Sequence, residues 1–548
     1  MTTVQSPTSH STFVRHSSKV PNGVIKLQLG NELLEAVQKT RIACWQLVCD
    51  ANHQLNALNI HQPHTSPRTG LPKMSTSYYI SFAISAIIGG LSVIALGRLW
   101  GFLVWLAKKS LDIIPTRHQP AENPKDEHIQ ILVVGDIGRS PRMQYHALSV
   151  AKHGKKVDIV GYKETARHPD LIGNPNVTVY PLAPPPEWIT WETLPFFLNI
   201  PCKVIQQFWT LFVTLMYTAP PAQWIIIQNP PSIPTFHVAL FVSWLRGSKV
   251  IVDWHNYGHT ILAQKSLLRI FVPFYKFYEI RLGKYLGNAN LAVTDAMTKQ
   301  LQAGGRFNLK NPVYTLHDRP AEIFQPIISP KARLEFLSRL AETKSHAKNI
   351  VDGSLRLVVS STSWTADEDF GMLLDALVAY ATPSSDQEDV PPILAIITGK
   401  GPQKEAYLEK IKELQDGGKL PGIRILSAWL SNRDYASLLA SADLGISLHK
   451  SSSGVDLPMK VVDMFGAGLP VAAYAGFESI GELVKEGQNG CGFETVPQLT
   501  DIFRRLLSLE GAQELAHLKK GAIEEGSRRW DEEWDSVVGP LIGVAKQT

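Results

Sequence analysis

The chain has 548 residues, more than a single hydrophobic core supports, so two or three domains are expected. Hydrophobic residues make up 44% and charged residues 19%, a balance that suits a globular enzyme with some membrane-facing surface. The net charge of +5 is small for this length, and no stretch clusters basic residues with aromatic ones, which excludes a nucleic-acid-binding protein. Mild basicity would suit anionic phosphates or an anionic lipid surface. The four cysteines are too few and too scattered for a disulfide scaffold or a zinc site, which favours a reducing compartment for most of the chain.

The beginning of the chain divides into a polar tail and a long apolar run. Residues 1–73 are rich in Ser, Thr, His, Asn and Gln and are expected to be a disordered tail with one transient amphipathic helix. From Tyr78 to Ala107 the only charged residue is Arg98, and the run is long enough for a helix to span a bilayer. A buried core helix and a cleaved signal peptide are the alternatives, and the length of the run argues against both. The excess of Lys and Arg on its C-terminal side predicts a cytosolic location for everything after residue 108.

The rest of the chain alternates apolar strands with helical stretches, which predicts parallel, doubly wound sheets. In residues 128–320, strands are expected at Ile129–Val134, Val157–Val160, Val177–Tyr180, Trp224–Gln228, Lys249–Asp253 and Ala289–Thr294. In residues 350–500 they are expected at Leu355–Ser360, Ile393–Thr398, Ile423–Leu426 and Leu444–Ser447, and residues 501–548 are expected to form C-terminal helices. The predicted fold class is α/β, with two Rossmann-like domains facing each other across a cleft, the arrangement called GT-B. The second domain is expected to bind a donor and the first an acceptor.

One segment inside the first domain, Phe196–Tyr217, is unusually apolar and aromatic. Lys203, Gln206 and Gln207 interrupt it, and a second membrane span would have to bury them. The sequence therefore favours an interfacial helix lying against a bilayer, and a buried helix of the first domain is the alternative.

Two stretches of the first domain follow strands and carry candidate site residues. The turn Gly135–Arg142 lies between a strand and a helix N-terminus, where backbone N–H groups favour an anion, so Gly138, Arg139 and Arg142 are candidates for acceptor binding. The turn lacks G-x-G-x-x-G spacing and the chain has no G-x-x-x-x-G-K-[ST], which excludes dehydrogenase and P-loop sites. His255 follows a second strand and is the first candidate for a catalytic base, with Asp136 as the alternative. A purely structural role for His255 remains equally open.

Three stretches of the second domain also follow strands and are typical of a diphosphate site. Small hydroxyls, a glycine-flanked lysine, a second lysine on a helix N-terminal turn and one carboxylate provide the candidates for donor binding. These residues are Ser363, Thr398, Gly399, Lys400, Gly401, Lys460 and Asp463. Asp463 is expected to accept hydrogen bonds from ribose hydroxyls. The acidic cluster Asp367–Asp369 is expected to cap the following helix or contact the acceptor rather than bind a metal, and no metal site is predicted.

These motifs resemble one family of glycosyltransferases. The strings GDIGRSPRMQYHA, QNPPSIPT, VDWHNYGHT, VTDAM, DRP, SSTSWTADEDF, ITGKGP and SSSGVDLPMKVVDMFGAGLPV are similar, in order and spacing, to those of chitobiosyldiphosphodolichol β-mannosyltransferases over roughly residues 128 to 495. Wider retaining relatives carry two glutamates separated by seven residues. Here the second aligns with Asp463, whereas the nearest upstream acid, Asp456, is one position out of step, which agrees with a separate inverting family.

The resemblance implies transfer of mannose from GDP-mannose to dolichol-diphosphate-linked chitobiose, with inversion, in the endoplasmic reticulum membrane. It implies a single-pass protein with cytosolic catalytic domains that needs no cofactor for the chemistry, although a divalent cation could stimulate it. Other mannosyltransferases of the dolichol pathway are candidate partners. A retaining mannosyltransferase and a catalytically silent scaffold in a transferase complex are the alternatives. Residues 1–73 match nothing in the family, and a start at Met74 would give the expected short lumenal N-terminus, so these residues are predicted to be dispensable.

Overall fold

The computed structural model describes residues 117–187, 196–365, 368–382 and 390–545, together with Gly101 and Ile189. The chain divides into two compact units, Met1–Ser110 and Leu111–Thr548, and the elements below belong to the second. The predicted tail 1–73 and the apolar run Tyr78–Ala107 lie outside the described residues, apart from Gly101. Among the helices that the structure describes, none has the length and apolar character needed to cross a membrane.

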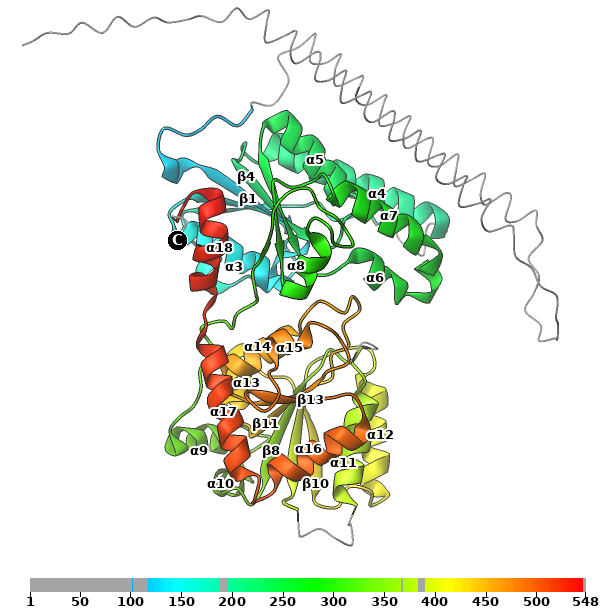
Figure 1. Ribbon diagram of the computed structural model, residues 1–548, viewed down its shortest axis with the longest axis vertical. Coiled ribbons are helices and arrows are strands. Elements are labelled where there is room, and N and C mark those ends of the chain that lie inside the picture. The colour runs from blue at the N-terminus through cyan, green and yellow to red at the C-terminus, as the bar shows by residue number, and fades with distance from the viewer. Residues whose placement is uncertain are drawn as a thin grey trace, which may run out of the picture. The chain divides into compact units, whose positions relative to one another are not determined.

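The first domain is built on a seven-stranded sheet in the order β3-β2-β1-β4-β5-β6-β7, and all its strand pairs are parallel (Figure 1). Its strands are β1 (His128–Asp136), β2 (Lys156–Tyr162), β3 (Val177–Pro181), β4 (Trp224–Asn229), β5 (Lys249–Trp254), β6 (Ala289–Ala292) and β7 (Val313–Thr315). The central strands are buried on both faces, as β-branched runs such as Trp224–Ile227 predict.

The second domain holds a six-stranded parallel sheet in the order β10-β9-β8-β11-β12-β13. Its strands are β8 (Arg356–Ser361), β9 (Ile393–Thr398), β10 (Ile423–Ala428), β11 (Leu444–Ser447), β12 (Val471–Tyr474) and β13 (Gly490–Phe493). The two doubly wound sheets confirm the predicted α/β class, and every strand expected from the sequence is present. β7, β12 and β13 were not predicted, and all three are short strands of three or four residues.

Helices cover both faces of the first sheet. The connections from β3 to β6 carry α4 (Phe196–Val213), α5 (Thr235–Arg246), α6 (Gly258–Ala263) and α7 (Val272–Gly283), and α8 (Asp295–Leu301) follows β6. The connection from β1 to β2 carries α3 (Pro141–Lys152). Because parallel crossovers are right-handed, the helices before and after the switch in strand order at β1 lie on opposite faces of the sheet.

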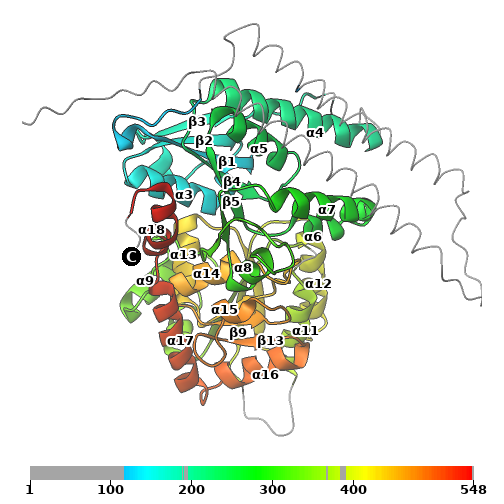
Figure 2. The ribbon, with the colours of Figure 1, turned by 45° about the horizontal axis from the view of Figure 1, so that its top comes forward.

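The helices of the second domain and the C-terminus complete the unit. The second domain contains α9 (Pro330–Arg339), α10 (Ala347–Asp352), α11 (Phe370–Ala381), α12 (Lys404–Asp416), α13 (Asn432–Ser441), α14 (Met459–Gly466), α15 (Ile480–Leu483), α16 (Val496–Leu507) and α17 (Ala512–Ser527). The last helix, α18 (Trp530–Ile542), instead packs beside α3 of the first domain (Figures 1 and 2). The predicted C-terminal helices therefore do not form one group.

The return of α18 is held by tryptophan side chains in the first core. Trp530 and Trp534 are buried together with Ile129, Ile226 and Ile251 of the sheet. Trp534 also donates a hydrogen bond from Nε1 to Nδ1 of His146 on α3, at 2.9 Å. The C-terminal helix thus supplies both apolar area and a directed hydrogen bond to a domain whose sheet begins about 400 residues earlier in the sequence.

We expect Trp534→Ala to destabilise the first domain strongly, because the substitution leaves a cavity and removes the hydrogen-bond partner of Nδ1 of His146. Large-to-small substitutions of this kind cost about 3–5 kcal/mol. Denaturant unfolding, with a separate spectroscopic probe in each domain, would measure the decrease in the free energy of unfolding of the first domain. Trp429→Ala, which truncates a tryptophan that is 63% exposed, is the matched control and should unfold like the wild-type chain. Equal stability of the two variants would contradict this account of α18.

Candidate active site

The carboxyl end of β5 carries a buried carboxylate, Asp253, that collects four N–H donors. Arg142 donates from Nε to Oδ2 at 2.8 Å and from Nη2 to Oδ1 at 2.9 Å. The Nε2 atoms of His146 and His255 lie 3.1 Å and 2.8 Å from Oδ2. Burial alone would raise the pKa of Asp253, but the charges of Arg142 and His255 and these hydrogen bonds outweigh it and hold the pKa well below its usual range. Asp253 is therefore a permanent anion.

This network fixes the protonation of His255. An ionised carboxylate only accepts hydrogen bonds, so Nε2 of His255 must carry the proton that it donates to Asp253. In the neutral ring Nδ1 then has a free lone pair. Nδ1 meets no hydrogen-bond partner within the part of the chain that the structure describes, and the side chain is 22% exposed. A histidine oriented by a buried carboxylate, with its other nitrogen open, has the arrangement of a general base. The sequence singled out His255 but not Asp253.

Asp136, the alternative base, has a structural role. Its Oδ1 accepts backbone N–H bonds from Gly138, Glu164 and Thr165 at 3.1–3.3 Å, and its Oδ2 accepts from the Thr165 hydroxyl at 2.5 Å. Burial raises its pKa, but the bonds from Thr165 and its neighbours outweigh this and lower the pKa overall. A carboxylate with a lowered pKa whose oxygens are already engaged is a poor proton acceptor. Asp136 joins the turn after β1 to the loop after β2.

The three residues expected to bind the acceptor differ in their burial and in their contacts. Arg142 is 3% exposed and is engaged by Asp253 and by Asp318, which lies 2.9 Å from its Nη1, so the prediction of an acceptor contact is corrected to an internal ion pair. A Cβ atom on Gly138 would lie 2.4 Å from Oγ1 of Thr165, so the glycine is required for loop packing. Arg139 alone is exposed at the surface, and its contact with Asp136 is a loose 3.5 Å. It remains a candidate for binding an anion.

In the second domain the loops after β8 and β9 are packed backbone to backbone. A Cβ atom on Gly399 would lie 1.7 Å from the carbonyl oxygen of Thr362, and one on Gly401 would lie 1.7 Å from that of Ser363. Gly399 also has φ of +133°, a conformation that side chains rarely allow. Both glycines are therefore needed to bring the two loops together. Thr398 ends β9 beneath them and donates to Ser361 at 3.3 Å.

Lys460 lies at the start of α14 and reaches the same loops. Its ammonium donates to Ser363 Oγ at 3.1 Å and forms an ion pair with Glu368. Glu368 is only 5% exposed and also accepts hydrogen bonds from the hydroxyl of Thr362 and the backbone N–H of Ser363, both at 2.5 Å. The structure thus brings together two of the predicted donor residues, Ser363 and Lys460, and adds a buried anion. Glu368 belongs to the predicted acidic cluster Asp367–Asp369, but its ion pair with Lys460 was not predicted from the sequence.

The other predicted donor residues lie in different surroundings. Lys400 is exposed and lies over the ring of Trp429, with Nζ 4.1 Å from the ring centroid. Asp369 occupies the N-cap position of α11 but makes no side-chain cap hydrogen bond, so the expected capping role is wrong; it pairs with Lys450 at 3.0 Å instead. Asp367 lies outside the described residues.

Asp463 is a neutral acid at the boundary between the domains. Burial, with the negative charge of Asp318 close by, raises its pKa to about 8. Burial raises the pKa values of Tyr145 and Tyr435, and the ionised form of Asp463 raises both further. At neutral pH Asp463 is therefore mostly protonated and can donate as well as accept a hydrogen bond. Its contact with a ribose stays a prediction.

Direct hydrogen bonds join the two domains beside these sites. Asn256, next to His255, donates to the hydroxyl of Ser452 at 3.2 Å. Ser452 belongs to the loop after β11, whose turn is held by Asp456 through Ser451 and Ser453. The residues of this loop lead directly into α14 and Lys460. The candidate base and the candidate donor-side cation therefore stand on elements that touch.

A second set of contacts surrounds the crossing between the domains. The carboxylate of Glu482 accepts the backbone N–H groups of Asp295 and Ala296 at 2.7 Å, and His317 lies against both Glu482 and Glu533. Asp295, His317 and Glu482 are close enough to share an ion. Burial lowers the pKa of His317, but its hydrogen bonds with the two glutamates raise it to about 9. The protonated imidazole is therefore engaged by both carboxylates.

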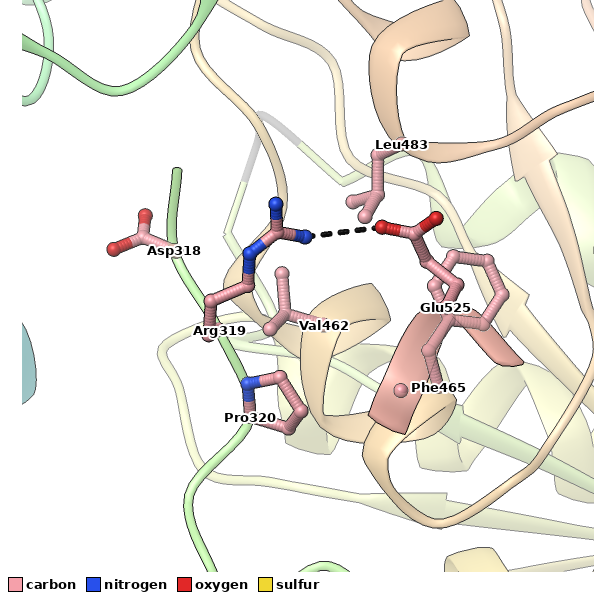
Figure 3. A pocket seen from close by; sticks show the side chains of 8 residues that line it. Asp318, Arg319, Pro320, Val462, Phe465, Leu483 and Glu525 are labelled. Carbon is pink, nitrogen blue, oxygen red and sulfur yellow. Dashed lines mark hydrogen bonds and ion pairs between the residues drawn. The ribbon is translucent and has the colours of Figure 1, made fainter. Parts of the chain in front are cut away.

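The pocket beside this crossing is lined by Asp318, Arg319, Pro320, Val462, Phe465, Leu483 and Glu525 (Figure 3). Arg319 spans it by an ion pair with Glu525 at 3.0 Å, while Asp318 points away from that pair. Because an internal ion pair occupies its polar groups, this pocket is a joint between the domains rather than the place where the predicted site residues gather.

Curated relatives of the chain are similar over most of its length. The chitobiosyldiphosphodolichol β-mannosyltransferase of Arthroderma benhamiae is 40% identical over 440 residues, which cover 79% of this chain and 95% of that protein. The protein of the same name from Homo sapiens is 38% identical, with 76% and 92% covered. A protein of Arabidopsis thaliana named UDP-glycosyltransferase TURAN is 39% identical, with 75% and 96% covered. No family profile matches the sequence.

Solved structures support the arrangement of the two sheets. Anabaena Alr3699/HepE, solved with UDP-glucose, has a TM-score of 0.52 at 17% identity and covers 76% of this chain and all of its own. A UDP-forming trehalose-phosphate synthase from Burkholderia vietnamiensis has a TM-score of 0.51 at 10% identity. Identities this low speak for the fold alone, which is the GT-B type of glycosyltransferase. The sequence relatives decide the family: the chain belongs to the chitobiosyldiphosphodolichol β-mannosyltransferases.

Proposed function

We propose that the protein transfers mannose from GDP-mannose to dolichol-diphosphate-linked chitobiose, forming the β-1,4-linked first mannose of the oligosaccharide used in protein N-glycosylation. The names of the relatives support the transferase activity and the lipid-linked acceptor. The observation that carries the proposed mechanism is the hydrogen bond between Asn256 and Ser452, because Asn256 neighbours His255 and Ser452 belongs to the loop that leads to Lys460.

The chemistry is a single displacement with inversion. The acceptor hydroxyl attacks the anomeric carbon of mannose while the bond from that carbon to the diphosphate oxygen breaks on the opposite face. His255 takes the hydroxyl proton on Nδ1, and Asp253 stabilises the imidazolium that results. The departing diphosphate gains negative charge, which Lys460 neutralises together with N–H dipoles at the start of α14. The lysine must leave Glu368 in part to do so, since both anions compete for one ammonium.

The apolar run Tyr78–Ala107 supports a proposed anchor in the endoplasmic reticulum membrane, with the catalytic domains in the cytosol. An acceptor that is itself a membrane lipid gives such an anchor a use, because tethered enzyme and acceptor meet at one surface at high local concentration.

The proposed reaction is tested with the purified full-length chain, GDP-mannose labelled in the sugar, and chitobiose linked through diphosphate to a phytanyl chain. We expect labelled product from GDP-mannose and none from UDP-GlcNAc or UDP-glucose. A β-mannosidase should remove the label and an α-mannosidase should not. Label removed by the α-enzyme would favour the retaining alternative, and absence of transfer from any donor would favour a silent scaffold.

The role of His255 predicts a large loss of rate when the imidazole is removed. His255→Ala should lower kcat by roughly 10² to 10⁴ without loss of fold. Asp253→Asn should also slow the reaction, because the ring loses the anion that orients it and stabilises its charged form. The matched control is His153→Ala, since His153 is similarly exposed and also meets a carboxylate, Asp535 at 2.7 Å. If His255→Ala keeps the wild-type rate, another group is the base.

Lys460 is expected to contribute directly to donor turnover. Lys460→Ala should lose at least about tenfold in kcat/KM, or about 1.4 kcal/mol of transition-state stabilisation. Glu368→Gln should weaken donor binding through a mispositioned lysine, so its effect should disappear in the Lys460→Ala background. Lys450→Ala is the control, because this neighbouring lysine is paired with Asp369 and is comparably exposed. Near-normal turnover by both Lys460→Ala and Lys400→Ala would remove the assignment of these cations.

A further inference from the structure

Exposed apolar side chains gather on the outer helices of the first domain. Of the fifteen large hydrophobic side chains that the described residues expose, eight lie on α4 and the turn that follows it, on α5, and on α7 and the turn that precedes it. They are Ile205, Trp209, Tyr217, Leu240, Trp244, Ile270, Phe274 and Phe277, with exposed fractions between 41% and 65%. We call this set the apolar face.

The three helices of the apolar face lie side by side. α5 is in the middle: the ring of Phe241 lies 5.7 Å from that of Phe212 on α4, and His237 is hydrogen-bonded at 2.6 Å to the hydroxyl of Tyr278 on α7. Along each helix the exposed side chains recur every three or four residues, which puts them on one stripe. All three helices belong to crossovers on the same side of the strand-order switch, so the stripes point away from the same face of the sheet (Figure 1).

The residues of α4 differ in burial along the helix. Its C-terminal end is anchored, with Leu211 fully buried and Phe212 only 3% exposed. Earlier on the same helix Trp209 is 53% exposed, so the segment is neither a wholly buried helix nor a free one. It packs on the domain by one side and presents the other, as an interfacial helix does.

The charges around the apolar face have one sign. Residues 196–294 contain eight Lys and Arg residues but only two acidic ones, Asp253 and Glu279, and both acids are 0% exposed and hydrogen-bonded inside the domain. Among the cations are Arg269 and Arg281, which are exposed on the turn before α7 and on α7 itself. The guanidinium of Arg281 lies 5.6 Å from the ring centroid of Phe277, within the apolar face. This surface is apolar and positively charged, with its negative charges neutralised internally.

We propose that the apolar face docks on the surface of an anionic lipid bilayer and holds the first domain there during catalysis. Aromatic side chains favour the headgroup region, and cations near them are attracted to anionic lipids. The proposal rests on the proposed function to the extent that a lipid-linked acceptor gives the docking a purpose.

The course of the chain agrees with this orientation. His118 donates from its backbone N–H to the carbonyl of Arg246 at 2.7 Å, so the polypeptide enters the first domain at the C-terminal end of α5, beside Trp244. The apolar run that ends at Ala107 precedes Arg117 by ten residues, a linker that reaches at most about 35 Å when extended. If that run is a membrane anchor, the length of the linker limits how far Arg117 can lie from the bilayer.

The test measures how deeply spin-labelled side chains lie in a lipid bilayer, and it does not depend on enzymatic activity. The full-length chain, with its cysteines replaced by serine, receives a single nitroxide at Trp244→Cys or Phe274→Cys and is reconstituted in liposomes containing phosphatidylserine. Ile328→Cys and Leu509→Cys are the matched controls, since these apolar side chains are 86% and 75% exposed on the second domain. We expect the labels on the apolar face to collide preferentially with oxygen, as in lipid, and the control labels with an aqueous nickel chelate.

Equal access of the nickel chelate to all four labels would overturn the proposal. Spin–spin broadening at Trp244→Cys that vanishes on dilution with unlabelled chain would also overturn it, because it would identify an interface between copies of the chain. A charge reversal gives a second readout. Lys276→Glu combined with Arg281→Glu should lower transfer to an acceptor in anionic liposomes by at least about tenfold, while transfer to a short-chain soluble acceptor is unchanged. Loss with both acceptors would contradict docking, and no transfer by the wild-type chain would refute only the proposed function.

Discussion

The interaction on which the first domain most depends is the capture of the Asp253 carboxylate by Arg142, His146 and His255. An ion removed from water in this way costs several kcal/mol unless its oxygens are fully bonded, and here four N–H donors from three side chains supply the bonds. The same contacts hold α3 against β5 and orient one imidazole toward the outside. Structural and chemical roles therefore coincide at one residue. A mutation of Asp253 would disturb the fold and the base together, so His255→Ala, which leaves the pair of Arg142 and Asp253 in place, is the cleaner test of the base.

In the second domain, Lys460 is held in place by an internal anion when no anionic ligand is bound. Glu368 partners Lys460 from a buried position and is itself fixed by Thr362 and the backbone of Ser363. The loop after β8, which carries Thr362 and Ser363, packs closely on the loop after β9 because Gly399 and Gly401 have no side chain at the point of contact. Rigid backbone packing thus prepares a site whose charge is already balanced. A diphosphate then exchanges one anionic partner of the lysine for another, which costs less than ordering a free side chain.

Most of the fold was predictable because its strands are β-branched runs bounded by turns. The missed strands show the limit: Gly490–Phe493 contains two glycines, and Val313–Thr315 has three residues, so neither carries a strand signal of its own. The site was predictable in position but less so in role. His255 and Lys460 stand where the sequence placed them, whereas Arg142 and Asp136 were expected to face ligand and instead bond inward. A polar residue at a strand end can bind a ligand or form hydrogen bonds inside the domain. Which of these it does depends on partners distant in the sequence, such as Asp253, which is 111 residues from Arg142.

The packing of α18 has a consequence for the order of events during synthesis. Domains generally begin to fold from the N-terminus as the chain emerges from the ribosome. Here Trp530 and Trp534, which follow the whole second domain in the sequence, pack on one face of the first sheet. Part of that face stays exposed while the second domain is synthesised. The nascent first domain is therefore a natural client for chaperones, and a chain that stops before Trp530 would lack the two side chains that complete the core of the first domain.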